Sequence, residues 1–429
     1  MRVLLLSDLY PPVVGGVEQH VQSLGRELVM RGHTVAVATI DTTGAGAGVE
    51  DDRGVTVHRL QTTLGRVGSL YAEAGRPFAP PAPDPELTLN LARLIRRTRP
   101  NVIHAHGWIV HSYLPIQGAA GIPLVVTLHD YGLVCAKKNL LYKGLTCAGP
   151  SLGKCLACAG RHYGPLRAVP ITLAEFISGP LERRAATTFI AVSDYVAEAN
   201  AVTGLNHEVI ANFLPRAVAV DHDRVRSWAD RLPREPFLLF VGALGTHKGF
   251  AVLLEAYRRL KGAPPLVCIG HRWVDTPDEI PSGVLVFEDW PHEAVRAAWS
   301  CASIGLVPSL WAEPFGIVAL EAMEAGVPVV ASRTGGLATV VDDGVTGILV
   351  PPGDAGALAT AIGRLLTDDE LRTTMGFNAR AAAGRYDAAV VIPQIERVYE
   401  RVAAERRRGS GRASPSPLRA RRGPTGPPP

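Results

Sequence analysis

The first forty residues, MRVLLLSDLYPPVVGGVEQHVQSLGRELVMRGHTVAVATI (Met1–Ile40), decide the fold. Apolar residues fill most of Arg2–Ser7, which is typical of a strand buried on both faces. Val17–Met30 then repeats apolar residues at helical spacing, and Thr34–Ile40 is a second run rich in β-branched residues. A strand, a helix and a strand in this order predict a parallel sheet covered by helices.

The same alternation recurs along both halves of the chain. In the first half we predict strands at Val102–His104, Leu124–Leu128 and Phe189–Val192, and a helix at Leu87–Arg97. The second half predicts strands at Phe237–Val241, Leu266–Ile269, Val284–Phe287, Ile304–Val307, Val327–Ala331 and Gly347–Val350, with helices at Gly249–Leu260, Glu293–Ser300 and Val318–Ala325. The fold class is therefore α/β, and two doubly wound domains of this kind would face each other across a central cleft.

The 429 residues divide into four parts on this basis. We expect an N-terminal domain over 1–212, a C-terminal domain over 213–385, a helix over 386–405 that packs back on the N-terminal domain, and a disordered basic tail over 406–429. The tail carries seven arginines and no acidic residue, so it accounts for the formal net charge of +4 and leaves the rest slightly acidic. This distribution speaks against specific nucleic-acid binding.

The lengths of the apolar stretches indicate the cellular location of the protein. None reaches the roughly 18–20 residues that span a bilayer, and the start of the chain lacks the features of a signal peptide. We therefore expect a cytoplasmic protein. The stretch Arg161–Ala186 mixes aromatic, apolar and basic residues. It predicts either a helix on the sheet with a solvated basic face, which we favour, or a peripheral contact with a membrane or a lipid-linked acceptor.

Two glycine-bearing loops each join a strand to a helix. Gly15 and Gly16 stand just before the first helix, where paired glycines let the backbone approach a ligand and free N–H groups favour an anion. A plain tight turn explains this first loop equally well. In the second half, VGALGTHKG (Val241–Gly249) places Lys248 where its point charge could reach a phosphate.

Two carboxylates flank a third glycine loop in EPFGIVALEAM (Glu313–Met323). Glu321 follows Glu313 by a little over two helical turns, so the two lie roughly on one side. Carboxylates accept hydrogen bonds from hydroxyls, in which sugars and riboses are rich. Two solvated acids near a helix start, where the helix dipole favours them, are the alternative.

EPFGIVALEAMEAGVPVVAS resembles the E-x7-E motif of GT4-type retaining glycosyltransferases, whose GT-B fold has two Rossmann-like domains facing a cleft. Further motifs agree in order, namely the Gly15-Gly16 loop, VVTLHD (Val125–Asp130), VGALGTHKG and SRTGGLATVVDDGVTGILVPPGD (Ser332–Asp354). The resemblance spans about residues 1–405. It implies an enzyme that moves a sugar from a nucleotide diphosphate to the hydroxyl of a sugar, lipid-linked or small-molecule acceptor, with retention at the anomeric carbon and a nucleotide-sugar-binding C-terminal domain.

The resemblance also implies a role for single residues. Glu321 would hold the ribose hydroxyls, and Glu313 would hold the hydroxyls of the donor sugar. Gly15, Gly16 and Lys248 would hold the diphosphate. The backbone N–H groups of Phe315, Gly316 and Ile317 would bind the sugar and phosphate, and His129 would lie beside the reacting sugar. No convincing Asp-x-Asp metal site is present, because Asp221-His222-Asp223 falls in the linker, so we expect no cofactor in catalysis.

Two positions depart from the family pattern. Ala243 stands where the family commonly has a phosphate-contacting Arg, and Thr339 stands where a Glu is usual after the paired glycines. Two other hypotheses stay open, of which the second is motivated by these departures. One is a nucleotide-sugar 2-epimerase of the same architecture, and the other is a non-catalytic nucleotide-sugar-binding protein. Contacts near Gly270–Trp273 and Glu288–Trp290 are our candidates for recognition of the base and sugar.

Four of the six cysteines cluster in one stretch, as Cys135, Cys147, Cys155 and Cys158. A Cys-x-x-Cys pair with two further cysteines is enough for a tetrahedral thiolate site in a reducing compartment. We expect a structural zinc ion there; an iron–sulfur cluster, a redox pair or thiols without metal are the alternatives. His104 and His106 could also be paired metal ligands, but we expect His104 to be a strand residue and His106 to face the cleft.

Overall fold

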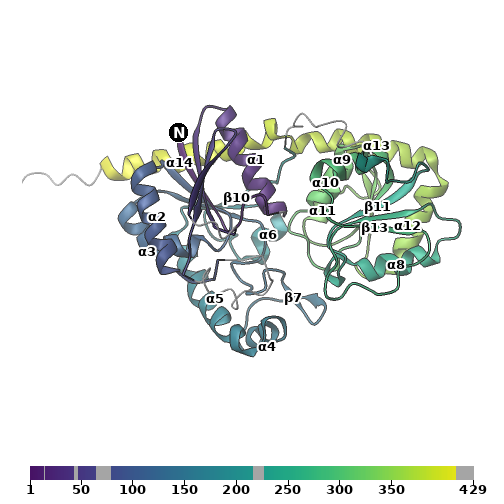
Figure 1. Ribbon diagram of the computed structural model, residues 1–429, viewed down its shortest axis with the longest axis horizontal. Coiled ribbons are helices and arrows are strands. Elements are labelled where there is room, and N and C mark those ends of the chain that lie inside the picture. The colour runs from purple at the N-terminus through teal and green to yellow at the C-terminus, as the bar shows by residue number, and fades with distance from the viewer. Residues whose placement is uncertain (14, 43–46, 64–78, 216–226, 412–429) are drawn as a thin grey trace, which may run out of the picture.

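Two α/β domains lie side by side in the computed structural model, and one long C-terminal helix runs along the N-terminal domain (Figure 1). The structure describes residues 1–13, 15–42, 47–63, 79–215 and 227–411. The predicted linker stretch Asp221-His222-Asp223 lies outside these residues. Each domain contains one large parallel sheet with helices packed against it, as the alternation of strands and helices predicts.

The N-terminal sheet has eight strands in the order β10-β9-β6-β5-β1-β2-β4-β3. Their bounds are β1 (Arg2–Ser7), β2 (Thr34–Ile40), β3 (Gly48–Asp52), β4 (Val55–Leu60), β5 (Val102–Ala105), β6 (Leu124–Leu128), β9 (Thr188–Ala191) and β10 (His207–Val209). All neighbours are parallel except β3, which pairs antiparallel with β4 at the edge. The sequence did not predict β3, since GVEDD is acidic and mostly exposed and has no alternation of apolar residues.

The described residues of the N-terminal domain form six helices. They are α1 (Gly16–Met30), α2 (Pro85–Thr98), α3 (Val110–Ala120), α4 (Leu152–Tyr163), α5 (Pro165–Ala185) and α6 (Asp194–Ala199). The Asp84 carboxylate begins α2 by accepting a hydrogen bond from the N–H of Leu87 at 3.0 Å. The sequence did not predict α3, because its apolar residues have no single face and Pro115 lies inside it.

The exposed face of α5 corrects our favoured interpretation of Arg161–Ala186. That face is largely apolar rather than a solvated basic surface. Leu166 is 91% exposed and Ile177 is 65% exposed, and the other exposed large apolar side chains of α5 are Val169, Leu173, Phe176 and Leu181. The basic residues lie mainly toward the helix ends, so they do not form the face that the composition suggested.

The C-terminal sheet has six parallel strands in the order β13-β12-β11-β14-β15-β16. Its strands are β11 (Phe237–Val241), β12 (Leu266–Ile269), β13 (Val284–Phe287), β14 (Ala302–Val307), β15 (Val329–Ser332) and β16 (Gly347–Val350). Its helices are α8 (Phe250–Arg259), α9 (His292–Cys301), α10 (Ile317–Glu324), α11 (Leu337–Val340), α12 (Ala355–Thr367) and α13 (Asp369–Ala383). The prediction of two doubly wound domains is confirmed.

The long helix α14 (Ala388–Gly411) follows the C-terminal domain but packs on the N-terminal one (Figure 1). Its Ile395 and Tyr399 lie in the same buried cluster as Val35 of β2, and the Tyr399 hydroxyl is 2.6 Å from Nδ1 of His104. The prediction of a disordered tail was wrong over 406–411, which remain helical. Arginine is a good helix former, and extending an existing helix requires no new nucleation. Residues 412–429 lie outside the described part.

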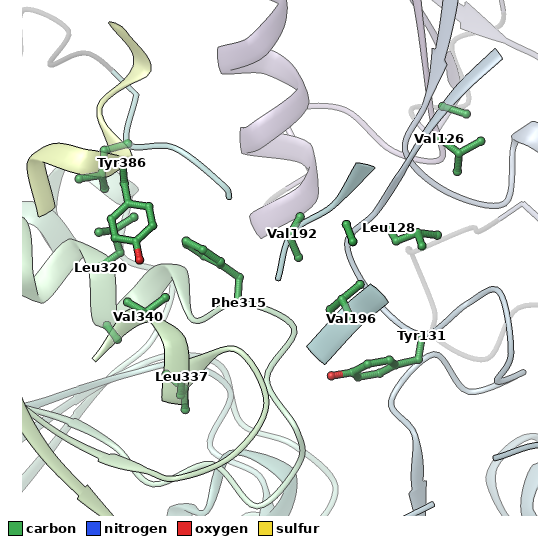
Figure 2. Close-up of a cluster of buried hydrophobic side chains, with 14 of the residues drawn as sticks. Val126, Leu128, Tyr131, Val192, Val196, Phe315, Leu320, Leu337, Val340 and Tyr386 are labelled. Carbon is green, nitrogen blue, oxygen red and sulfur yellow. The ribbon is translucent and has the colours of Figure 1, made fainter. Parts of the chain in front are cut away.

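An apolar cluster joins the two domains beside the cleft. Figure 2 shows Phe315 and Leu337 of the C-terminal domain opposite Val192 and Tyr131 of the N-terminal domain. All four side chains are at most 3% exposed. This contact fixes how the cleft-facing loops of the two domains meet. Within the part of the chain that the structure describes, no helix is both long and apolar enough to span a bilayer.

Candidate active site

The loop between β14 and α10 carries Glu313 to the boundary between the domains. The Tyr131 hydroxyl donates to the Ala312 carbonyl at 2.7 Å, and the Ser193 hydroxyl donates to the Pro314 carbonyl at 2.7 Å. Both donors belong to the N-terminal domain, so each domain takes part in shaping this loop. Neither contact was foreseen, since nothing in the local sequence pairs these residues with the loop.

Two glycines support the loop from the other side. The N–H of Gly336 donates to the Glu313 carbonyl at 2.6 Å. A β-carbon on Gly335, whose φ is +52°, would lie 2.2 Å from that carbonyl oxygen, and one on Gly336 would lie 2.5 Å from the Pro314 oxygen. Any side chain at either glycine would therefore displace the loop. Thr339 follows on α11 and is exposed, so the chain places no carboxylate at this position.

Glu313 is a buried carboxylate held by a cation. Its Oε1 accepts hydrogen bonds from Lys248 Nζ at 2.7 Å and from the Ser309 hydroxyl at 2.6 Å. Burial opposes ionisation, but Lys248, Ser309 and Trp311 together outweigh it and hold the pKa of Glu313 below its ordinary value. The carboxylate is therefore ionised at neutral pH, and both of its oxygens can accept hydrogen bonds from hydroxyls.

The backbone around Lys248 directs this side chain at the Glu313 loop. Lys248 ends a 3₁₀ turn, Thr246–Lys248, which closes on Gly249 at a φ of +73°. A β-carbon on Gly249 would lie 1.9 Å from the Pro308 carbonyl oxygen, so only glycine fits this approach of the two loops. The Lys248 ammonium also lies 5.0 Å from the centre of the Trp311 ring.

Glu321 lies on α10 and pairs with a histidine of α9. The Nε2 atom of His292 is 2.7 Å from Glu321 Oε1. Burial lowers the pKa of His292, but the hydrogen bond and charge of Glu321 outweigh that effect and raise it above its ordinary value. The sequence did not indicate this histidine, since it begins a helix remote in sequence from the Glu motif.

Replacing His292 with Gln should lower the melting temperature more at pH 6 than at pH 9. Because folding raises the pKa of His292, its stabilisation is fully present below the unfolded pKa of 6.5 and is lost as the pH rises through the folded pKa. We expect the effect of the substitution to differ by about 2 °C between the two pH values. Thermal unfolding of both proteins measures this, and an equal loss at both pH values would contradict the pairing.

His129 follows β6 and lies in a group of largely buried imidazoles. Its Nε2 is 3.0 Å from Nδ1 of His106, and the His20 ring packs edge-on against it with centroids 4.7 Å apart. Burial, together with repulsion from neighbouring imidazoles, lowers the pKa of His129 well below its ordinary value. The side chain is therefore neutral at physiological pH, and can donate one hydrogen bond and accept another.

The histidines around His129 also include His104 and His106, which the sequence offered as possible paired metal ligands. His104 is a buried residue of β5 whose two ring nitrogens lie 2.6 Å from the Tyr399 and Thr127 hydroxyls. Ring nitrogens of His20, His106 and His129 lie within 4.8 Å of one another. These three could hold a metal ion, whereas His104 is occupied by hydrogen bonds. His20 was not foreseen because it lies inside α1.

The paired glycines of the first loop face the second domain. A β-carbon on Gly16 would come within 3.6 Å of Ile317 Cδ1, so the loop before α1 meets the start of α10. Gly15 is extended, and Glu18 folds back over it, with Oε2 2.1 Å from where a β-carbon would lie. The starts of two helices, with their N–H groups, thus meet at one place.

A partly buried carboxylate that the sequence did not single out supports the same loop. Asp8 accepts hydrogen bonds from the N–H groups of Trp108 and Ile109 at 3.2 and 2.6 Å. It also pairs with Lys138 Nζ at 3.3 Å. An Asp after the first strand is a visible feature of the sequence, but its partners come from two distant segments.

The structure also places the candidates for base recognition. Arg272 bonds through its N–H and its Nε to Glu288, so Gly270–Trp273 and Glu288 lie together beyond the ends of β12 and β13. Trp290 instead packs with Trp228 in an aromatic cluster and is 8% exposed. It is therefore part of the core rather than open to a ligand.

Comparisons with known proteins point to one family. Residues 14–217 match the family described as Glycosyltransferase Family 4, and residues 226–382 match Glycosyl transferases group 1. A glycogen synthase of Mycobacterium tuberculosis is 28% identical over an alignment covering 97% of both chains. Sucrose-phosphate synthase from Thermosynechococcus elongatus has a similar structure, with a TM-score of 0.70 and 22% identity over 94% of this chain and 99% of the other. The structure of Anabaena HepE in complex with UDP-glucose is also similar, with a TM-score of 0.65. Its sequence is 18% identical, and the match covers 93% of this chain and 99% of the other.

Proposed function

Because the chain belongs to the GT4-type glycosyltransferases and has their GT-B fold, we propose that its sugar transfer from a nucleotide-diphosphate donor proceeds with retention at the anomeric carbon. The observation that carries this proposal is the buried Glu313 carboxylate, held against Lys248 where the two domains meet. The pair places a hydrogen-bond acceptor for sugar hydroxyls next to a cation that can bind phosphate.

We assign the donor sugar and the diphosphate to these two side chains. The ionised Glu313 accepts hydrogen bonds from hydroxyls of the sugar. The Lys248 ammonium, 2.7 Å from that carboxylate and 24% exposed, can turn toward the leaving diphosphate without losing Glu313 as a neighbour. The N–H groups of Phe315, Gly316 and Ile317 lie at the start of α10, where a helix favours negative charge.

The chemistry needs stabilisation of the leaving group. The bond between the anomeric carbon and the diphosphate oxygen breaks, and its electron pair stays on that oxygen. The acceptor oxygen forms its new bond on the same face of the sugar, and the acceptor proton passes to the departing phosphate oxygen. Negative charge grows on the phosphate as the bond breaks, so Lys248 and the N–H groups of α10 act most strongly in the transition state.

His129 fits a hydrogen-bonding role beside the reacting sugar. Its imidazole is neutral because of its burial, and one of its nitrogens already lies 3.0 Å from His106. We propose that the other nitrogen meets a hydroxyl of the donor sugar. A neutral ring positions that hydroxyl without placing a cation beside the anomeric carbon, where positive charge develops.

Glu321 and His292 form a second acceptor site on the same side of α10. We propose that the Glu321 carboxylate accepts the ribose hydroxyls of the donor, with His292 holding its orientation at 2.7 Å. The solved complex of HepE contains UDP-glucose, which makes a uridine diphosphate sugar the first donor to test. The exposed apolar face of α5 makes a lipid-linked sugar the first acceptor to test.

A donor screen tests this function. The full chain is incubated with UDP-, GDP-, ADP- and TDP-sugars, with and without sugar and lipid-linked acceptors, and the release of nucleoside diphosphate and the products are measured. We expect one donor to raise the melting temperature and to release nucleoside diphosphate when an acceptor is present. Glu321→Gln should raise the KM for that donor by roughly 10-fold, because the substitution removes a hydrogen-bonded charge.

The outcomes of the screen separate the alternatives. An epimer of the donor formed without acceptor would indicate a 2-epimerase. A donor that binds but never releases nucleoside diphosphate with any acceptor would indicate a non-catalytic binding protein. Either result would overturn the proposal.

A further inference from the structure

The segment 135–158, which we call the cysteine insertion, brings four cysteines to one small cavity. Cys135 lies in the loop after β6, and Cys147 follows the hairpin of β7 (Leu141–Tyr142) and β8 (Leu145–Thr146). Cys155 and Cys158 lie one turn apart on α4. All four side chains line the same cavity of about 30 Å³. A loop, a hairpin and a helix thus each bring a cysteine to the lining of one cavity.

The cysteine insertion has little apolar core to hold it in place. Its two strands are two residues each, and Leu145 of the second strand is 74% exposed. Lys138, Leu140 and Lys143 all have positive φ, which costs free energy in residues other than glycine. A segment with so little apolar core and this backbone is typical of small units that are stabilised by a bound metal ion.

The surroundings of the sulfurs suit thiolates bound to a cation. The N–H of Ser151 donates to Cys155 Sγ at 3.4 Å. The Lys154 ammonium donates to the Gly149 carbonyl, which also accepts a hydrogen bond from the Cys147 thiol at 3.4 Å. Donors of this kind stabilise negative charge on sulfur.

The charge and the size of the cavity favour a single ion. A divalent ion with four thiolates leaves two negative charges, and Lys137 and Lys154 both line the cavity. The cavity is small, about 30 Å³, which suits a single bound ion.

We propose that the cysteine insertion binds one zinc ion through Cys135, Cys147, Cys155 and Cys158. No three of these sulfurs, all of them in the described part of the chain, lie within 4.8 Å of one another, so binding must draw the hairpin toward α4. Four thiolates at about 2.3 Å from the ion would then satisfy its tetrahedral preference. The site is distinct from the cleft and takes no part in sugar transfer chemistry.

Zinc at this place would also position Lys138, the partner of Asp8. Lys138 is three residues after Cys135, and its N–H donates to the Cys135 carbonyl at 2.8 Å. Its ammonium pairs with Asp8 at 3.3 Å and lies 4.1 Å from the Trp108 ring centre. The ion would hold the turn that carries Lys138, and through it the Asp8 loop that leads to Gly15.

Metal analysis of the full chain tests the proposal. The protein is purified in reducing buffer without chelator, and zinc and iron are measured by mass spectrometry. We expect about one zinc per chain, almost no iron and no absorbance near 400 nm. The Cys155→Ser/Cys158→Ser variant should lose at least about nine-tenths of the zinc, whereas Cys301→Ser, which changes an exposed cysteine outside the site, should keep it.

A second measurement on the unaltered chain guards against a variant that fails to fold. Modification of its thiols with a mercurial should release the zinc, detected with a chromogenic chelator. After an excess of another thiol has removed the mercurial, the metal-free chain should have a melting temperature lower by about 5 °C or more, and added zinc should restore it. Stoichiometric iron in place of zinc would overturn the proposal. So would a chain that holds no metal and whose melting temperature zinc leaves unchanged.

Discussion

Glu313→Gln should lower kcat by about 10²–10³-fold while the protein stays folded. Glutamine keeps the size of the side chain and one hydrogen-bond acceptor, but it removes the charge that Lys248 and Ser309 hold in place. The pKa of Glu313 is held below its ordinary value, so the native residue is ionised throughout the neutral range. The loss should therefore be nearly constant between pH 6 and pH 8, as steady-state kinetics would show.

The matched control for this substitution is Glu324→Gln. Glu324 lies at the end of the same region, on α10, and its ion pair with Arg296 at 3.1 Å is partly exposed. Glu324→Gln removes the same charge as Glu313→Gln and also breaks an ion pair with a cation, but Glu324 does not contact Lys248. We expect its kcat to stay within about 2-fold of the native value, since exposed ion pairs contribute little. A Glu313→Gln variant as active as this control would contradict the role of Glu313.

Lys248→Met should lower kcat/KM for the donor by about 10²-fold or more. Methionine keeps most of the apolar stem and removes the ammonium that we assign to the diphosphate. The effect should be large in this chain because Ala243, in the same loop, supplies no second cation. The exposed Lys261→Met serves as the control, and we expect it to change kcat/KM by less than about 2-fold.

Two further variants separate the two roles of Lys248. The loss of Lys248 also leaves Glu313 buried without its counter-charge, so the double variant with Glu313→Gln should lose less than the two single losses multiplied together. Adding Ala243→Arg to Lys248→Met should recover about 10-fold in kcat/KM if the missing charge is the cause. No recovery, together with full multiplication of the single losses, would contradict the assignment of Lys248 to the diphosphate.

Local rules predicted where some residues of the site lie, and the family resemblance supplied their roles. Gly16, Lys248 and Glu313 each follow a buried strand, and the carboxyl ends of parallel strands meet at one edge of a sheet. The alternation of strands and helices therefore placed these residues at that edge, but their roles at the donor came from the resemblance to the GT4-type family. The Lys248–Glu313 pair at 2.7 Å is the direct result of that rule, applied to two adjacent loops of one domain.

The partners that complete the site follow no local pattern. Tyr131 and Ser193 reach the Glu313 loop across the domain boundary, and His292 reaches Glu321 from another helix. Such contacts depend on the relative placement of whole elements, which one sequence does not encode in its spacing. The same holds for β3 and α3, whose residues lack the period of the element that they form because the rest of the domain supplies the packing.

The stereochemistry of the first product tests the central claim most directly. The donor identified in the screen is an anomer of known configuration, and proton NMR of the glycoside formed early in the reaction gives the coupling constant at its anomeric carbon. An α-linked donor sugar should yield an α-linked product, because leaving group and acceptor occupy the same face of the sugar. A β-linked product from an α-linked donor would contradict a same-face displacement supported by Glu313 and Lys248.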